Sequence, residues 1–226
     1  MEWQWDWALV GHILPELARA FRVTIAATVF GFSLALVGGL LLTILRRSRW
    51  KIISWPAHFT VEFIRSTPLL VQLFFIYFVL PIQLPDFGGM FTSAFVTGVL
   101  ALGLHYSSYT SEVYRAGIDG VPKGQWEAAA ALNMSRGRTW TSVVLPQAIP
   151  PVLPALGNYL IAMFKDTPLL YAISVAEVLT AAYQIGSQRF QYVEAFTIVG
   201  ALFLIVSLIS AWLIRRMERW TALPAQ

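Results

Sequence analysis

The sequence contains no cysteine, only three histidines and few charged residues, and each shortage excludes a class of function. Without cysteine there is no disulfide, no thiolate metal site and no cysteine nucleophile. Charged residues make up 12% of the chain and hydrophobic residues 57%, against about 25% and about 45–50% in soluble domains. The net charge of +4 is small, so it does not indicate a nucleic-acid surface. The composition therefore indicates a membrane protein.

Five stretches without charge are long enough to cross a bilayer as helices, because about 20 residues span the hydrocarbon core. These stretches are Val23–Leu45, Ser66–Pro85, Phe87–Ser111, Thr139–Phe164 and Ala195–Ile214. Backbone groups in lipid must be paired internally, and none of the stretches alternates as a barrel strand would. We expect an all-α, polytopic membrane protein with five transmembrane helices, the second beginning near Phe59, and residues 1–226 as a single transmembrane domain.

The basic residues predict the orientation of these helices. Eleven of the 16 lysines and arginines follow the first, third or fifth stretch, and such residues gather on the cytoplasmic side. We therefore expect the amino terminus outside and the carboxyl terminus in the cytoplasm. Residues 1–20 are expected to form an external amphipathic segment anchored by Trp3, Trp5 and Trp7, and residues 165–190 an external helix or loop.

The cytoplasmic loop over residues 116–138 carries the clearest local pattern. An alanine-rich helix is expected from Trp126 to Leu132, with Glu127 in its first turn near the positive end of the helix dipole. Asn133 tolerates the left-handed conformation that closes a helix, and Ser135 can cap the next helix. The loop is thus predicted to be a compact pair of helices that the groove of another protein could accept.

This loop resembles the EAA loop of ABC-importer permeases. The matching residues are Glu127-Ala128-Ala129, Asn133 and Val143-Val144-Leu145-Pro146, with departures at Asn133, where glycine is usual, and at Val143, where isoleucine is usual. Phe63–Gln72 and Phe164–Thr167 resemble the polar amino-acid (His/Gln/Arg-type) branch, which usually has glycine at the position of Ser66 and serine at that of Pro168. The combination of these residues with Gly103–Tyr106 and Gly124–Glu127 is most similar to ectoine/hydroxyectoine uptake permeases.

The resemblance implies a type I importer in the bacterial cytoplasmic membrane. Its partners would be a cytoplasmic ATPase dimer, a second permease subunit (a copy or a paralogue), an extracytoplasmic solute-binding protein and membrane lipid. The sequence has no Gly-x-x-x-x-Gly-Lys-Ser/Thr loop, so ATP and Mg²⁺ would be bound by the ATPase only, and no cofactor is expected here. In this assembly Glu127 would fix the geometry of the coupling helix, and Ala128, Ala129 and Leu132 would form its docking surface. Asn133, also in the coupling loop, would shift the angle between the two short helices.

Polar residues within the expected spans are candidates for the solute pathway, because ionisable groups in a bilayer are costly and usually face a cavity or protein. The candidates are Arg65, Thr67, Gln72, Glu112, Lys165 and Asp166. Arg65 can pair with Glu62 or hold a solute carboxylate, and Glu112 can pair with Arg115 or relay protons. Lys165 and Asp166 can meet the solute or hold the external helix.

Two other functions remain open at this point. One is an intramembrane enzyme that uses His105 and Glu112, although three good metal ligands are hard to assemble and no catalytic or metal residues are expected. The other is a non-conducting scaffold subunit of a membrane complex.

Overall fold

All regular elements that the structure describes are helices, which confirms the all-α class. The structure, a computed structural model, describes residues 5–84 and 93–221. Its elements are α1 (Trp7–Arg46), α2 (Lys51–Arg65), α3 (Leu69–Phe74), η1 (Phe75–Val79), α4 (Leu80–Gln83), α6 (Ala94–Asp119), α7 (Lys123–Ala131), α8 (Arg136–Thr139), η3 (Trp140–Val144), α9 (Leu145–Asp166), η4 (Thr167–Ile173), α10 (Val178–Arg189) and α11 (Tyr192–Thr221).

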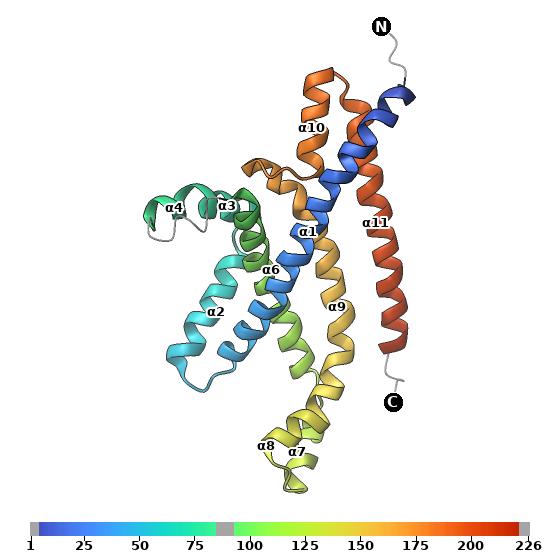
Figure 1. Cartoon of the computed structure of the whole chain (residues 1–226). Coiled ribbons are helices and arrows are strands. Elements are labelled where there is room, and N and C mark those ends of the chain that lie inside the picture. The colour runs from blue at the N-terminus through green and yellow to red at the C-terminus, as the bar shows by residue number, and fades with distance from the viewer. Residues whose placement is uncertain (1–4, 85–92, 222–226) are drawn as a thin grey trace.

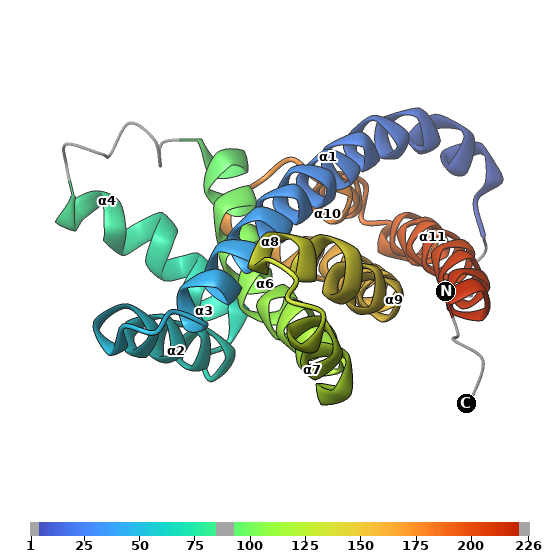
Figure 2. The ribbon, with the colours of Figure 1, turned by 90° about the horizontal axis from the view of Figure 1, so that it is seen from below.

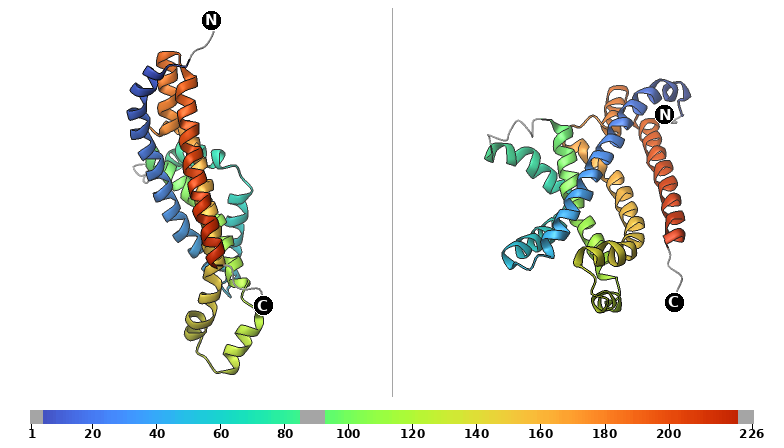
Figure 3. Two further views of the ribbon diagram at one scale, coloured as in Figure 1. Left: turned by 90° about the vertical axis from the view of Figure 1, so that its right-hand side faces the viewer. Right: turned by 60° about the horizontal axis from the view of Figure 1, so that its bottom comes forward.

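The helices form an elongated bundle around α1, α6 and α9 (Figure 1). α1, α6 and α11 run from the upper to the lower end of this view, and α2 and α9 run the opposite way. From below, α2–α4 and α11 lie on opposite sides of this centre (Figure 2). α7 and α8 project beyond the other helices at the lower end, which is clearest from the side (Figure 3).

α1 and α6 approach closely because glycine lines their crossing. A Cβ atom on Gly39 would overlap Thr110 Oγ1 and lie 2.9 Å from the backbone nitrogen of Ser111. The Thr110 hydroxyl donates to the carbonyl of Ala35 at 2.8 Å, and the Thr43 hydroxyl donates to that of Ser111 at 3.1 Å. Small residues with hydroxyl bonds across the contact are typical of helix pairs in membranes.

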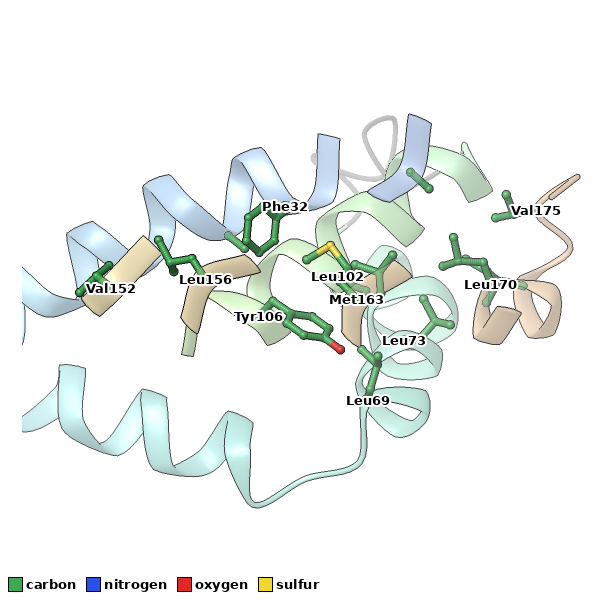
Figure 4. Packing of buried hydrophobic residues seen from close by; sticks show 14 residues of the cluster. Phe32, Leu69, Leu73, Leu102, Tyr106, Val152, Leu156, Met163, Leu170 and Val175 are labelled. Atoms are coloured by element: carbon green, nitrogen blue, oxygen red, sulfur yellow. The ribbon is translucent and has the colours of Figure 1, made fainter. Parts of the chain in front are cut away.

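A hydrophobic core joins α1, α3, α6, α9 and the chain that follows α9 (Figure 4). Its labelled members are Phe32, Leu69, Leu73, Leu102, Tyr106, Val152, Leu156, Met163, Leu170 and Val175. Because the core includes Leu69 and Leu73 of α3, it fixes where the polar residues between α2 and α3 lie relative to α6.

The expected external segment over residues 1–20 is not a separate helix. α1 is continuous for 40 residues from Trp7 and passes through Pro15. Leu9, Ile13 and Leu17 are buried against α10 and α11, so their apolar face covers protein and not a membrane surface. Trp3 lies outside the described residues.

Two described helices, Trp7–Arg46 and Tyr192–Arg219, are long and apolar enough to cross a membrane alone. The number rises to four if each of two bent helix pairs is one span. α6 is 26 residues long, but it contains a run of buried polar side chains that includes His105, Ser108 and Thr110. Five spans, and the side on which each terminus lies, remain predictions.

The expectation that the second span begins near Phe59 and continues as one helix is wrong, and its expected end, Pro85, lies outside the described residues. α2 ends at Arg65, α3 begins at Leu69, and the two segments are bent by 108°. Pro68 has no N–H group and disfavours helical backbone at Thr67, so the helix stops before it.

Residues 165–190 contain η4, a left-handed residue at Ser174 and α10, and their side of the membrane stays a prediction.

Candidate functional site

The α7–α8 hairpin, residues 123–139, begins earlier than expected. α7 starts at Lys123 after Pro122, not at Trp126. Glu127 therefore lies in the second turn, and its expected place in the first turn is wrong. Its side chain is exposed, so it is available to another protein.

Asn133 closes α7 as the sequence predicts. Its φ of 52° is left-handed, and its N–H donates to the carbonyl of Ala130 at 2.9 Å. The N–H of Met134 donates to the carbonyl of Ala129 at 3.0 Å, which completes a Schellman motif. The Ser135 hydroxyl then accepts from the N–H of Arg138 at 3.4 Å and caps α8. These local bonds give the hairpin a defined angle.

The hairpin is fixed to η3, which leads into α9, by an apolar contact. The rings of Trp126 and Trp140 meet edge to face, with centroids 5.4 Å apart. Ala129 is only 2% exposed, so its expected place on the docking surface is wrong. Ala128 is exposed and Leu132 is 76% exposed, so they form the free face.

At the break between α2 and α3, the Gln72 side chain bonds to groups at the end of α2. Its amide nitrogen donates to the carbonyl of Ile64 at 2.8 Å and to the Thr67 hydroxyl at 2.6 Å. In a continuous helix the Ile64 carbonyl would accept from residue 68, but Pro68 has no N–H. Because the amide nitrogen faces these acceptors, the amide oxygen accepts from His105 Nδ1 at 3.0 Å. The break is therefore hydrogen-bonded to the middle of α6.

A group of aromatic side chains joins α6 to the end of α9. The Tyr106 hydroxyl donates to Asp166 Oδ2 at 2.7 Å. The Tyr109 ring lies 5.4 Å from that of Tyr159 and 5.2 Å from that of His105. Sequence reasoning missed Tyr106 and Tyr159; the spacing of Tyr159 from Asp166, two helical turns, was the available signal.

Glu112 is the centre of an ion-pair cluster at the lower half of α6. It lies 2.7 Å from Arg46, 2.6 Å from Arg115 and 3.7 Å from Arg65. The Arg46 side chain is only 6% exposed, and sequence reasoning did not pair it with Glu112. Arg65 is also 3.8 Å from Glu62, so the expected pairs exist within a larger cluster. This arrangement favours a structural role for Glu112 over a proton relay.

The six pathway candidates are not all brought together. Thr67 lies with Gln72 at the helix break, whereas Arg65 lies with Glu112 and over the Tyr109 ring, 5.7 Å from its centroid. Asp166 reaches the same aromatic group through its bond from Tyr106. Lys165 is exposed on the last turn of α9.

A cavity of about 980 Å³ separates the ion-pair cluster from the α7–α8 hairpin. Glu112 and Arg115 line its α6 side, Gln147 and Pro151 its α9 side, and Gln125 its α7 side. The Gln147 amide donates to Gln125 Oε1 at 3.3 Å, so α7 and α9 are also hydrogen-bonded here.

The fold and these sites define a helical membrane protein with a hydrogen-bonded hairpin that projects beyond the bundle. Residues 27–222 match the family described as "Binding-protein-dependent transport system inner membrane component". The chain belongs to this family of transport permeases.

The chain is similar to permease proteins, and the similarity extends over nearly the whole length of both chains. It is 47% identical to "Probable amino-acid ABC transporter permease protein y4tG" of Sinorhizobium fredii, covering 91% of this chain and 87% of that protein. It is 34% identical to "Glutamine transport system permease protein GlnP" of Escherichia coli, covering 96% and 97%. A chain from the "Crystal structure of an amino acid ABC transporter with histidines" superposes with a TM-score of 0.87 at 34% identity, covering 96% and 99%.

This family assignment sets aside the intramembrane enzyme, since the relatives are transport subunits whose ATPase is a separate subunit. Within the described ranges, no group of three His, Asp or Glu side chains is placed so that it could hold a metal ion.

Proposed function

We propose that this chain is the transmembrane permease subunit of an ATP-driven importer for polar amino acids in a bacterial cytoplasmic membrane. The names of its relatives support the solute class and the family description supports the membrane. In this proposal the chain crosses the membrane five times, with its amino terminus outside and its carboxyl terminus in the cytoplasm.

The observation that carries the proposal is the rigid hairpin beyond the bundle. Its closure at Asn133 and the contact of Trp126 with Trp140 give it one orientation relative to α9. Movement of the hairpin is therefore transmitted to α9 and, through the packing of Val152 of α9 on Gly117, to α6. An ATPase dimer that contacts Glu127, Ala128 and Leu132 would move the spans by this route and bind ATP and Mg²⁺ itself.

The remaining partners complete the pathway. A second permease subunit forms its other half, and an external solute-binding protein delivers the solute. Both partners follow from the importer class, and the second permease subunit is a copy or a paralogue of this chain.

The solute pathway is proposed to pass beside α6, where Arg65 lies against Glu112 and Tyr109 and where Asp166 accepts from Tyr106. Arg65 lies 3.7 and 3.8 Å from its carboxylates, too far for short hydrogen bonds, so its guanidinium can donate hydrogen bonds to a solute carboxylate. Tyr106 occupies one oxygen of Asp166, which leaves the other oxygen for a cationic group. A polar amino acid carries both groups, and so does ectoine or hydroxyectoine, which we retain as the finer alternative. Gln72 and Thr67 hold the helix break, and Lys165 is a candidate for the outer entrance.

The coupling proposal is tested by ATP hydrolysis in the complex purified from its own membranes through a tag on this chain. The Glu127→Lys variant is expected to lose the ATPase subunits or their activity. Glu16→Lys, the same reversal at an exposed site at the other end of the molecule, is expected to keep both. If no ATPase accompanies the wild type after mild solubilisation, the importer assignment fails.

The pathway proposal is tested by solute uptake with the assembly intact. Arg65→Gln and Asp166→Asn are expected to reduce uptake at least tenfold while the ATPase subunits still co-purify, and Arg65→Lys to retain more activity than Arg65→Gln. Normal uptake by both neutral variants would favour the scaffold subunit.

A further inference from the structure

The lower end of α11 carries an aromatic and basic cluster that the transport proposal does not use. Trp212, Arg215, Arg216 and Arg219 line a hollow of about 280 Å³. Their spacing places all four on one face of the helix. The Arg216 guanidinium lies 5.7 Å from the centroid of the Trp212 ring.

This face points away from the bundle. Ile214, about 160° around the helix from Arg216, is the buried residue at this level, at 7% exposure. It packs on Gly157 of α9, where a Cβ atom would lie 2.9 Å from Ile214 Cγ1. The opposite side of α11 is therefore the side with the arginines, and Figure 2 shows α11 at the edge of the bundle.

The same face continues upward as an apolar stripe. Ile205, Leu208 and Ile209 are 53%, 57% and 55% exposed, and Trp212 follows them at 54%. The order along the face is thus aliphatic, then tryptophan, then arginine. A phospholipid has the matching order of parts: acyl chains, then the glycerol region at the bilayer interface, where tryptophan gathers, then phosphate.

We propose that this face binds an anionic phospholipid, whose acyl chain lies along Ile205–Ile209 and whose phosphate is held by Arg215, Arg216 and Arg219. Guanidinium groups bind phosphate through paired hydrogen bonds, and the +3 charge favours a headgroup with a net negative charge. An acidic surface of a protein partner would use the arginines but not the aliphatic stripe, so the stripe favours lipid.

The experiment measures how much phosphatidylglycerol the intact transporter retains. The transporter is solubilised from membranes that contain phosphatidylglycerol and phosphatidylcholine, and the lipid molecules bound to it are counted by native mass spectrometry. The test variant is Arg215→Gln/Arg216→Gln/Arg219→Gln. The matched control is Arg19→Gln/Arg22→Gln/Arg189→Gln, which removes the same charge from exposed positions outside the α7–α8 hairpin and the proposed solute pathway. Arg216→Gln alone is included because loss of three arginines can disturb insertion of α11.

We expect the test variant to bind phosphatidylglycerol on the order of 100-fold more weakly, since three basic residues near the surface are removed. The single variant should lose part of this affinity, the control should match the wild type, and phosphatidylcholine should be poorly retained by all. Equal losses in test and control would contradict the proposal, as would unchanged retention in the single and triple variants. Displacement of the lipid by inorganic phosphate at constant ionic strength would show a free-anion site instead, and loss of the ATPase subunits with lipid retained would show a protein contact.

Discussion

Replacing Asn133 with valine perturbs the closure of the α7–α8 hairpin and little else. Asn133 has a φ of 52° and is exposed, so the new side chain removes no packing. A β-branched residue is strained in the left-handed region, whereas glycine adopts it freely. In the Asn133→Val variant the hairpin must hold the strain or give up its two closing hydrogen bonds.

Both outcomes weaken the closure by a similar amount. The left-handed conformation costs an ordinary residue about 1–2 kcal/mol. The bonds from Asn133 to Ala130 and from Met134 to Ala129, at 2.9 and 3.0 Å, contribute about 0.5–1.5 kcal/mol each. The hairpin should therefore open about 5–30 times more often.

Hydrogen exchange of the Asn133 and Met134 amides measures this opening directly, because these are the two donors. Protection should fall about 5–30-fold in Asn133→Val and be equal or greater in Asn133→Gly. Ala131→Val, an exposed change within α7, serves as the control and should leave both amides protected. Wild-type protection in Asn133→Val would refute the claim that the left-handed residue holds the hairpin.

Three further predictions concern the bundle, each measured as the free energy of unfolding in detergent. Gly39→Ala should destabilise by about 1–3 kcal/mol because its Cβ would meet α6, while Gly200→Ala, with nothing within 4 Å, should have no such effect. Glu112→Gln should cost about 3 kcal/mol because it leaves the buried Arg46 guanidinium without its closest carboxylate, and adding Arg46→Met should recover part of the loss. Gln72→Leu should cost about 1–2 kcal/mol, since the helix break loses its donor. An unaltered unfolding free energy in Gly39→Ala, Glu112→Gln or Gln72→Leu would contradict the contact assigned to that residue.

Features set by local chemistry were predictable from the sequence. The left-handed conformation at Asn133 and the cap at Ser135 follow from residue type and neighbours within one turn, and both are confirmed. Pro68 also acts locally, because it has no N–H group and disfavours helical backbone at Thr67, so α2 ends before it. The size of the bend, 108°, depends on Gln72 reaching His105 of α6 and on the core, which no local pattern encodes.

The contacts between distant helices were not predictable for the same reason. Arg46 and Glu112 are 66 residues apart, and local spacing pairs Glu112 with Arg115, a neighbour on its own helix. Tyr106 and Asp166 are 60 residues apart, and only the packing of α6 on α9 brings them together. The face of α7 that is buried depends likewise on Trp140, so Ala129 was assigned to the wrong side.

The central claim, that the α7–α8 hairpin docks on an ATPase, is tested most directly by site-specific cross-linking. The chain contains no cysteine, so a single Leu132→Cys substitution can carry a benzophenone maleimide at a side-chain position that is 76% exposed. Ile209→Cys, on the outward face of α11, is the control. The account predicts that irradiation of the intact complex joins position 132, but not position 209, to the ATPase subunit. Cross-links from position 132 to lipid or detergent alone, in a complex that still contains the ATPase, would contradict it.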